Sequence, residues 1–124
     1  MEEKIIYKDL SYQIVGLAIQ VRKELGYGFL EKVYENALMV LLEENGIKAE
    51  QQVSIKVHFH GRVVGNYIAD ILVEDSIILE IKTIENISRY ERAQTINYLK
   101  ATSLKLAIVL NFGKDNLMHE RFVF

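Results

Sequence analysis

Hydrophobic residues recur every three or four positions in the first third of the chain, which predicts two amphipathic helices. The first runs from Lys8 to Leu25, where Ile14, Leu17 and Val21 mark the buried face. Gly26-Tyr27-Gly28 interrupts this pattern, because two glycines permit a left-handed turn and a close corner between helices. The second helix covers about residues 29–44 and ends at Asn45-Gly46. Its inward-facing residues are expected to be Leu30, Val33, Ala37 and Leu41.

The pattern then changes to the two-residue period of β-strands. Apolar and polar side chains alternate over residues 53–59, which predicts a half-buried strand that turns at His60-Gly61-Arg62. A second strand over about residues 63–73 and a third over residues 77–83 flank the acidic triplet Glu74-Asp75-Ser76. We therefore expect an antiparallel meander of three strands.

The last third of the chain predicts a helix followed by buried strand. Ser88-Arg89-Tyr90-Glu91 matches a capping box, which begins a helix that runs to about Ala101. The continuous apolar run over residues 104–110 is typical of a strand covered on both faces, and residues 112–124 allow one more short strand. Residues 1–124 are thus expected to form a single α/β domain of order ααβββαβ, with a mixed sheet flanked by helices.

Composition restricts the chemistry of this domain. The absence of cysteine excludes disulfides, thiolate zinc sites and cysteine nucleophiles, so a metal would need oxygen or imidazole ligands. No apolar run approaches the roughly 20 residues that span a bilayer, and Met1-Glu2-Glu3-Lys4 does not begin a signal peptide. We therefore expect a cytoplasmic protein without a membrane partner. The formal charge of −2 does not favour binding to a polyanion, but bound metal cations would neutralise a carboxylate cluster.

Three charged residues of the second and third strands are the strongest candidates for chemistry. Glu80 and Lys82 lie two residues apart, so their side chains project from the same face of the third strand. Asp70 lies among apolar neighbours, where an unpaired carboxylate would be costly to desolvate. A carboxylate in this position needs a partner.

The length of the connecting loop decides whether Glu80 is that partner. If Glu74-Asp75-Ser76 is a three-residue loop, Val73 pairs with Ile77 and Asp70 lies opposite Glu80 on the same face, with Cβ atoms about 4.5–5.5 Å apart. A two-residue loop would instead pair Asp70 with Leu79 and send Glu80 to the other face. Two carboxylates in the first arrangement repel each other unless a proton or a divalent cation intervenes, and Mg²⁺ or Mn²⁺ suits such oxygen ligands. Lys82 could then stabilise charge on the transition state or help to orient and deprotonate an attacking water.

These residues resemble the core of the PD-(D/E)XK nuclease superfamily, in which an aspartate precedes Glu-x-Lys. The segment Gly28-Phe29-Leu30-Glu31-Lys32-Val33-Tyr34 is also similar to the signature of the small GxxExxY branch of that superfamily. The proline that gives the superfamily its name is absent, since Ala69 precedes Asp70. The resemblance implies that Asp70 and Glu80 bind the metal, with the backbone carbonyl of Ile81 as a third ligand, and that Lys82 is the catalytic lysine.

The resemblance also implies roles for residues on two helices. Glu31 matches the glutamate that borders the metal site in RecB-like nucleases, which makes it a further candidate ligand. Gln94 and Tyr98, four residues apart, resemble the Gln-x-x-x-Tyr element of the same nucleases, in which glutamine helps to position the site and tyrosine could contact nucleic acid. Tyr34 is a second candidate for substrate contact. Both tyrosines could equally be core aromatics whose hydroxyl groups find a polar partner.

Other charged residues have simpler explanations. His58 and His60 share one face of a strand and could bind a metal, but the alternating pattern already places them on its solvent side. Arg89, Arg92 and Lys100 recur at helical spacing and are expected to form a solvated face or an outer DNA contact. By itself, an aspartate followed by Glu-x-Lys also occurs by chance as surface charge.

The sequence therefore predicts a metal-dependent nuclease that hydrolyses DNA, with RNA as the less favoured substrate. A homodimer would enlarge the small surface that one copy offers to a duplex. Two alternatives remain open. The first is a catalytically silent module of the same fold that binds nucleic acid or protein. The second is a hydrolase of other substrates or a metal sensor, which the net negative charge favours.

Overall fold

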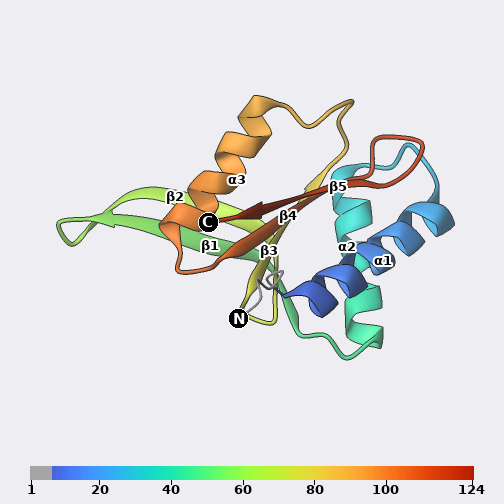
Figure 1. Cartoon of the computed structure of the whole chain (residues 1–124), viewed down its shortest axis with the longest axis horizontal. Coiled ribbons are helices and arrows are strands. Elements are labelled where there is room, and N and C mark those ends of the chain that lie inside the picture. Colours follow the sequence, from blue (N-terminus) through green and yellow to red (C-terminus); the bar gives the residue numbers. More distant parts are fainter. Residues whose placement is uncertain (1–6) are drawn as a thin grey trace, which may run out of the picture.

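Three helices and five strands make up the fold in the computed structural model, which describes residues 7–124 (Figure 1). The elements are α1 (Lys8–Leu25), α2 (Glu31–Glu44), β1 (Ala49–Phe59), β2 (Arg62–Val73), β3 (Ile77–Lys82), α3 (Arg89–Ala101), β4 (Leu106–Asn111) and β5 (Met118–Val123). This confirms the predicted α/β class and the order ααβββαβ, to which β5 adds a final short strand. Residues 1–4, used above to predict the location, lie outside the described part of the chain.

The strands form one mixed sheet in the order β1-β2-β3-β4-β5. β1, β2 and β3 pair antiparallel, which confirms the predicted meander. β4 runs parallel to β3, while β5 runs antiparallel to β4. α3 connects the parallel pair, because two parallel strands cannot be joined by a tight turn.

Helices cover both faces of this sheet, with α1 and α2 on one face and α3 on the other (Figure 1). The α1–α2 face holds the larger hydrophobic core, which includes Ile14, Tyr34, Leu38, Leu79, Ile108 and Phe112. The α3 face holds a smaller core that includes Ile55, Ile78, Tyr98 and Leu99. β4 is buried along its whole length between these two layers, as its apolar run predicted.

α2 turns a different face toward the core from the one the sequence predicted. Leu30 and Val33 are exposed, with 79% and 38% of their surface accessible. Ala37 and Leu41 are only partly buried, and the fully buried side chains are Tyr34, Leu38 and Leu42. Apolar side chains occupy most sides of α2, so the sequence pattern allows either of two apolar faces to pack against the core. The stripe that contains Tyr34 faces inward, where the Tyr34 ring stacks on Phe112 with centroids 4.7 Å apart.

The predicted signals at the helix ends are confirmed. Gly26 and Gly28 both adopt positive φ, at 82° and 104°, and turn the chain sharply between α1 and α2. Ser88 and Glu91 form both halves of the capping box at the start of α3. These local features fix where the helices meet the sheet.

Candidate active site

The β2–β3 hairpin has the three-residue loop that places two carboxylates together. Val73 pairs with Ile77, and the pairing continues to Ile71 opposite Leu79. The next position along this register brings Asp70 opposite Glu80. The two-residue loop, which would have separated these side chains, is excluded.

The carboxylates of Asp70 and Glu80 bridge the two strands where the backbone pairing ends. The backbone N–H of Asp70 donates to Glu80 Oε2 at 3.3 Å, and the backbone N–H of Ile81 donates to Asp70 Oδ2 at 2.7 Å. Each carboxylate therefore accepts a hydrogen bond from the opposite strand. Side chains replace the backbone acceptors at the point where β2 and β3 diverge, which is where the sequence predicted the acidic site.

Burial raises the free-energy cost of ionising these two carboxyl groups. Only 3% of Glu80 is exposed, and Asp70 is half-buried. Burial, reinforced by the nearby charge of Asp70, raises the pKa of Glu80 from 4.5 to about 8. Burial also raises the pKa of Asp70, although its hydrogen bond from Ile81 opposes the change. The positive charge of Lys82 lowers both pKa values, so its ammonium lies within electrostatic reach of both carboxylates.

Glu31, the first residue of α2, brings a third carboxylate to the end of β3. Its Oε2 accepts from the backbone N–H of Thr83 at 3.3 Å, one residue beyond Lys82. Its negative charge contributes to the raised pKa of Asp70. Glu31 thus borders the Asp70–Glu80 pair from a segment that is distant in sequence.

Glu35, one turn further along α2, is a carboxylate that sequence reasoning missed. It is 3% exposed, and its negative charge contributes to the raised pKa of both Asp70 and Glu80. Once Tyr34, Leu38 and Leu42 are taken as the inward stripe, Glu35 stands out as a charged residue on the same side of the helix. This is the signal that could have found it.

Three side chains compensate the buried charge of Glu35. Gln51 donates to its Oε2 at 2.7 Å, Gln52 donates to the same atom at 3.1 Å, and Lys32 lies 3.2 Å away. Gln52 adopts a φ of 54° within β1, a conformation that non-glycine residues rarely take. Backbone strain of this kind is concentrated at functional sites. β1 therefore contributes to the surroundings of the acidic pair although it carries none of the predicted site residues.

α3 lies over the same region of the sheet and contributes Gln94 and Tyr98. Tyr98 is 5% exposed, and its ring meets the edge of Tyr67 at a centroid distance of 5.2 Å. Burial and the nearby charges of Glu80 and Asp70 raise the pKa of Tyr98 well above its usual value. Gln94 is half-buried one turn earlier on the helix. α3 thus approaches the acidic pair with Tyr98.

Tyr34, in contrast, packs in the core and stabilises the fold. It is fully buried, its hydroxyl donates to the carbonyl of Gly26 at 2.7 Å, and it accepts from the N–H of Phe29 at 3.2 Å. The predicted substrate contact for Tyr34 is therefore not supported, because its hydroxyl already holds the corner between α1 and α2. Of the two roles that the sequence left open for Tyr34, the structure favours that of a core aromatic.

The sequence and the structure agree with a known family. A family model described as the PD-(D/E)XK nuclease superfamily matches residues 8–122. The chain belongs to the PD-(D/E)XK nuclease superfamily. The match includes every candidate site residue, from Glu31 to Tyr98.

A solved structure shares the fold of this chain. The crystal structure of SSO0001 superposes with a TM-score of 0.58 at 18% sequence identity. The alignment covers 75% of this chain and 50% of that chain, so this protein spans about half the length of SSO0001. Similarity at this level shows the fold alone. No curated protein sequence matches the chain.

The donor atoms of the acidic pair fit a divalent cation in part. Asp70 and Glu80 offer paired hard oxygen ligands, and a cation would offset the burial and the repulsion by Asp70 that together raise the pKa of Glu80. Across residues 7–124, however, no three carboxylate or imidazole side chains converge closely enough to form a complete metal site. Glu31, the third proposed protein ligand, accepts a hydrogen bond from Thr83 through Oε2.

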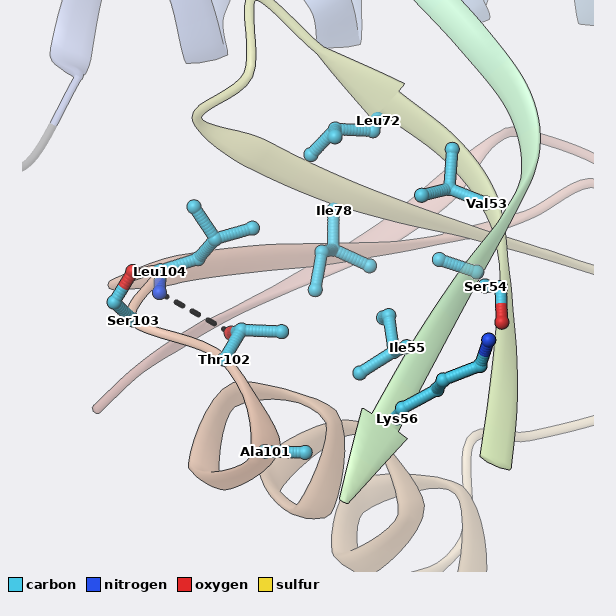
Figure 2. A pocket seen from close by; sticks show the side chains of 11 residues that line it. Val53, Ser54, Ile55, Lys56, Leu72, Ile78, Ala101, Thr102, Ser103 and Leu104 are labelled. Atoms are coloured by element: carbon cyan, nitrogen blue, oxygen red, sulfur yellow. Dashed lines mark hydrogen bonds between the residues drawn. The ribbon is translucent and has the colours of Figure 1, made fainter. Parts of the chain in front are cut away.

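A hollow of about 280 Å³ opens on the α3 face between β1 and the segment after α3, with mostly apolar side chains such as Val53, Ile55 and Leu104 on its walls (Figure 2). Neither Asp70 nor Glu80 lines this hollow, so it is separate from the acidic pair. Within the described residues, every helix is too short or too polar to traverse a lipid bilayer.

Proposed function

We propose that this protein is a metal-dependent nuclease of the GxxExxY branch that hydrolyses phosphodiester bonds in DNA, with RNA as the less favoured substrate. The observation that carries the proposal is the opposed Asp70–Glu80 pair, fixed by the register of β2 and β3, with Lys82 beside it. Membership of the PD-(D/E)XK superfamily supports the reaction type.

Asp70 and Glu80 would hold Mg²⁺ or Mn²⁺, with the carbonyl of Ile81 and the carboxylate of Glu31 as the further proposed ligands. When bound, the cation would polarise the scissile phosphate and lower the pKa of a water molecule. Glu80, whose pKa is raised to about 8, would release its proton when the cation binds.

The remaining site residues position the reactants. The side chain of Lys82 either stabilises, as an ammonium, the negative charge that develops on the phosphate or, as a free amine, orients and deprotonates the attacking water. Glu35 and its glutamine partners keep α2 in place against β1, and Gln94 positions the site from α3. Tyr98 contacts the nucleic acid only if the α3 face opens, since its side chain is buried here.

Cleavage assays with a matched variant test the proposal. Wild-type protein is incubated with supercoiled plasmid, single-stranded DNA and RNA in the presence of Mn²⁺, and Glu80→Ala serves as the paired variant. We expect wild type to cut DNA and Glu80→Ala to lose this activity while remaining folded by circular dichroism.

Other outcomes contradict the proposal in distinguishable ways. Tight DNA binding without cutting would show a catalytically silent binding module. Neither binding nor cutting would favour a hydrolase of other substrates or a metal sensor. Cutting that persists in Glu80→Ala would show that another site, or a contaminant, performs the reaction.

The cytoplasmic location and the homodimer both stay predictions. Fractionation of cells and the molar mass of the purified protein in solution would test them separately.

A further inference from the structure

The outer part of the β1–β2 hairpin extends past the helices that cover the rest of the sheet (Figure 1). We define the outer hairpin as residues 56–66, which include the tip at His60 and Gly61. Nearly all of its side chains are exposed, among them Phe59 at 64% and Val64 at 63%. Strand residues exposed on both faces form a free ribbon, and this ribbon does not contribute to either hydrophobic core.

The charge of this ribbon differs from that of the whole chain. Residues 51–69 contain Lys56, Arg62 and two histidines but no carboxylate, although the chain has a net charge of −2. Among the residues that the structure describes, no carboxylate lies within ion-pair distance of Lys56 or Arg62. Elsewhere, Lys48 pairs with Asp75 and Arg92 pairs with Glu120. The outer hairpin therefore presents uncompensated positive charge.

We propose that the outer hairpin is an arm that binds duplex DNA, an inference that rests on the proposed nuclease function. The major groove of B-DNA admits a two-stranded β-ribbon. Lys56 and Arg62 would contact phosphates on its walls, and the exposed Phe59 and Val64 would contact apolar atoms inside the groove.

The arm and the acidic pair can reach the same duplex. Arg62 begins β2, and Asp70 lies eight residues further along the same strand. At about 3.4 Å per residue, this segment spans roughly 27 Å, which is less than one turn of B-DNA at about 34 Å. A straight duplex bound along β2 from Arg62 would therefore be long enough to extend to the position of Asp70.

A second copy of the chain is the main competing partner for this exposed surface. A symmetric contact between two outer hairpins would bring Lys56 and Arg62 of both copies toward each other, because a two-fold interface uses the same patch twice. Like charges disfavour such an interface, whereas DNA offers the complementary charge. The charge of the arm thus favours DNA over a second copy.

Binding measurements without metal separate this inference from catalysis. Anisotropy of a labelled DNA duplex is measured in EDTA over a range of salt concentrations, for wild type and for the double variant Lys56→Gln/Arg62→Gln. The control is Lys8→Gln/Lys23→Gln, which removes the same charge from α1. We expect the arm variant to bind on the order of fifty-fold more weakly at 0.1 M salt, with a salt slope reduced by about 2. The control should bind like wild type.

Each other result overturns a different part of the account. Equal loss in the arm variant and the control would show non-specific charge rather than an arm. Unchanged DNA binding by the arm variant, together with a change in its molar mass in solution, would show a contact between copies. If wild type cuts DNA and the arm variant binds and cuts equally well, the arm inference fails while the nuclease function stands. If wild type neither binds nor cuts DNA, both fail.

Discussion

The two halves of β2 perform opposite tasks although they belong to one continuous strand. The inner half, residues 69–73, is buried or half-buried and carries Asp70 opposite β3. The outer half, residues 62–68, is mostly exposed, pairs only with β1 and carries Arg62. The inner half holds the half-buried carboxylate of Asp70, and the outer half presents positive charge to solvent.

This difference shows how one strand can separate chemistry from recognition. The inner half needs close packing on both faces, because the position of Asp70 depends on register and burial. The outer half needs only a ribbon backbone and accessible side chains. Substitutions in the inner half should therefore affect stability and catalysis, whereas substitutions in the outer half should affect binding alone.

The largest expected effect concerns the charged residue beside the inner half. Lys82→Ala should reduce DNA cleavage by about 10²- to 10³-fold, because it removes a preorganised positive charge from the transition state. Single-turnover kinetics with Mn²⁺ measure the effect, and Lys23→Ala on α1 is the control. Equal cleavage rates for Lys82→Ala and wild type would show that Lys82 takes no part in catalysis.

A pair of truncations compares the two halves directly. Ile71→Ala, at a fully buried position, should lower the free energy of unfolding by about 2–5 kcal/mol because it leaves a cavity. Val64→Ala, in the exposed outer half, should change it by less than about 0.5 kcal/mol. Urea denaturation of both variants gives the comparison. Similar losses would show that the outer hairpin belongs to the folded core.

A glycine near the site tests how tightly the end of β3 is held. A Cβ atom at Gly113 would lie 2.7 Å from backbone atoms of Thr83 and Ile84, directly after Lys82. Gly113→Ala should therefore cost about 1–3 kcal/mol of stability and displace Lys82, with a matching loss of cleavage. Gly16→Ala in α1 meets no atom within 4 Å and should instead stabilise by up to about 1 kcal/mol. Thermal unfolding of both variants gives the sign of each change in stability. Unchanged stability of Gly113→Ala would show that the segment containing Thr83 and Ile84 can move to accommodate the new side chain.

The last effect is a pH dependence of stability that comes from the acidic pair. The folded protein raises the pKa of Glu80 from 4.5 to about 8, so between these values it binds more protons than the unfolded chain. The stability of metal-free protein should thus fall as pH rises from about 4.5 to 8, by at most about 1.4 kcal/mol per pH unit from this group. Chemical denaturation across this range measures the slope, which Glu80→Gln should flatten. Stability that rises with pH in the wild type would contradict the raised pKa.

Much of the fold follows from local patterns in the sequence. The three-residue loop at Glu74-Asp75-Ser76 fixed the register of Asp70 against Glu80, because a strand has only two faces. The capping box at Ser88 and the glycine corner at Gly26 also act over a few residues. Such features need no knowledge of distant contacts, and the structure confirms them.

The parts that could not be predicted depend on contacts between distant segments. The predicted inward face of α2 was wrong, because it is set by the stacking of Tyr34 on Phe112, two residues that are distant in sequence. The burial of Glu35 depends on Gln51 and Gln52 of β1. The positive φ of Gln52 could not be predicted from the sequence, since glutamine is not a residue that favours this conformation.

The most direct measurement of the central claim is calorimetric titration of Mn²⁺ into four proteins. These are wild type, Asp70→Asn, Glu80→Gln and the arm variant Lys56→Gln/Arg62→Gln. If Asp70 and Glu80 jointly hold the cation, either single substitution should abolish binding, and the arm variant should bind Mn²⁺ like wild type. Undiminished Mn²⁺ binding by Asp70→Asn and Glu80→Gln would contradict a shared metal site between β2 and β3.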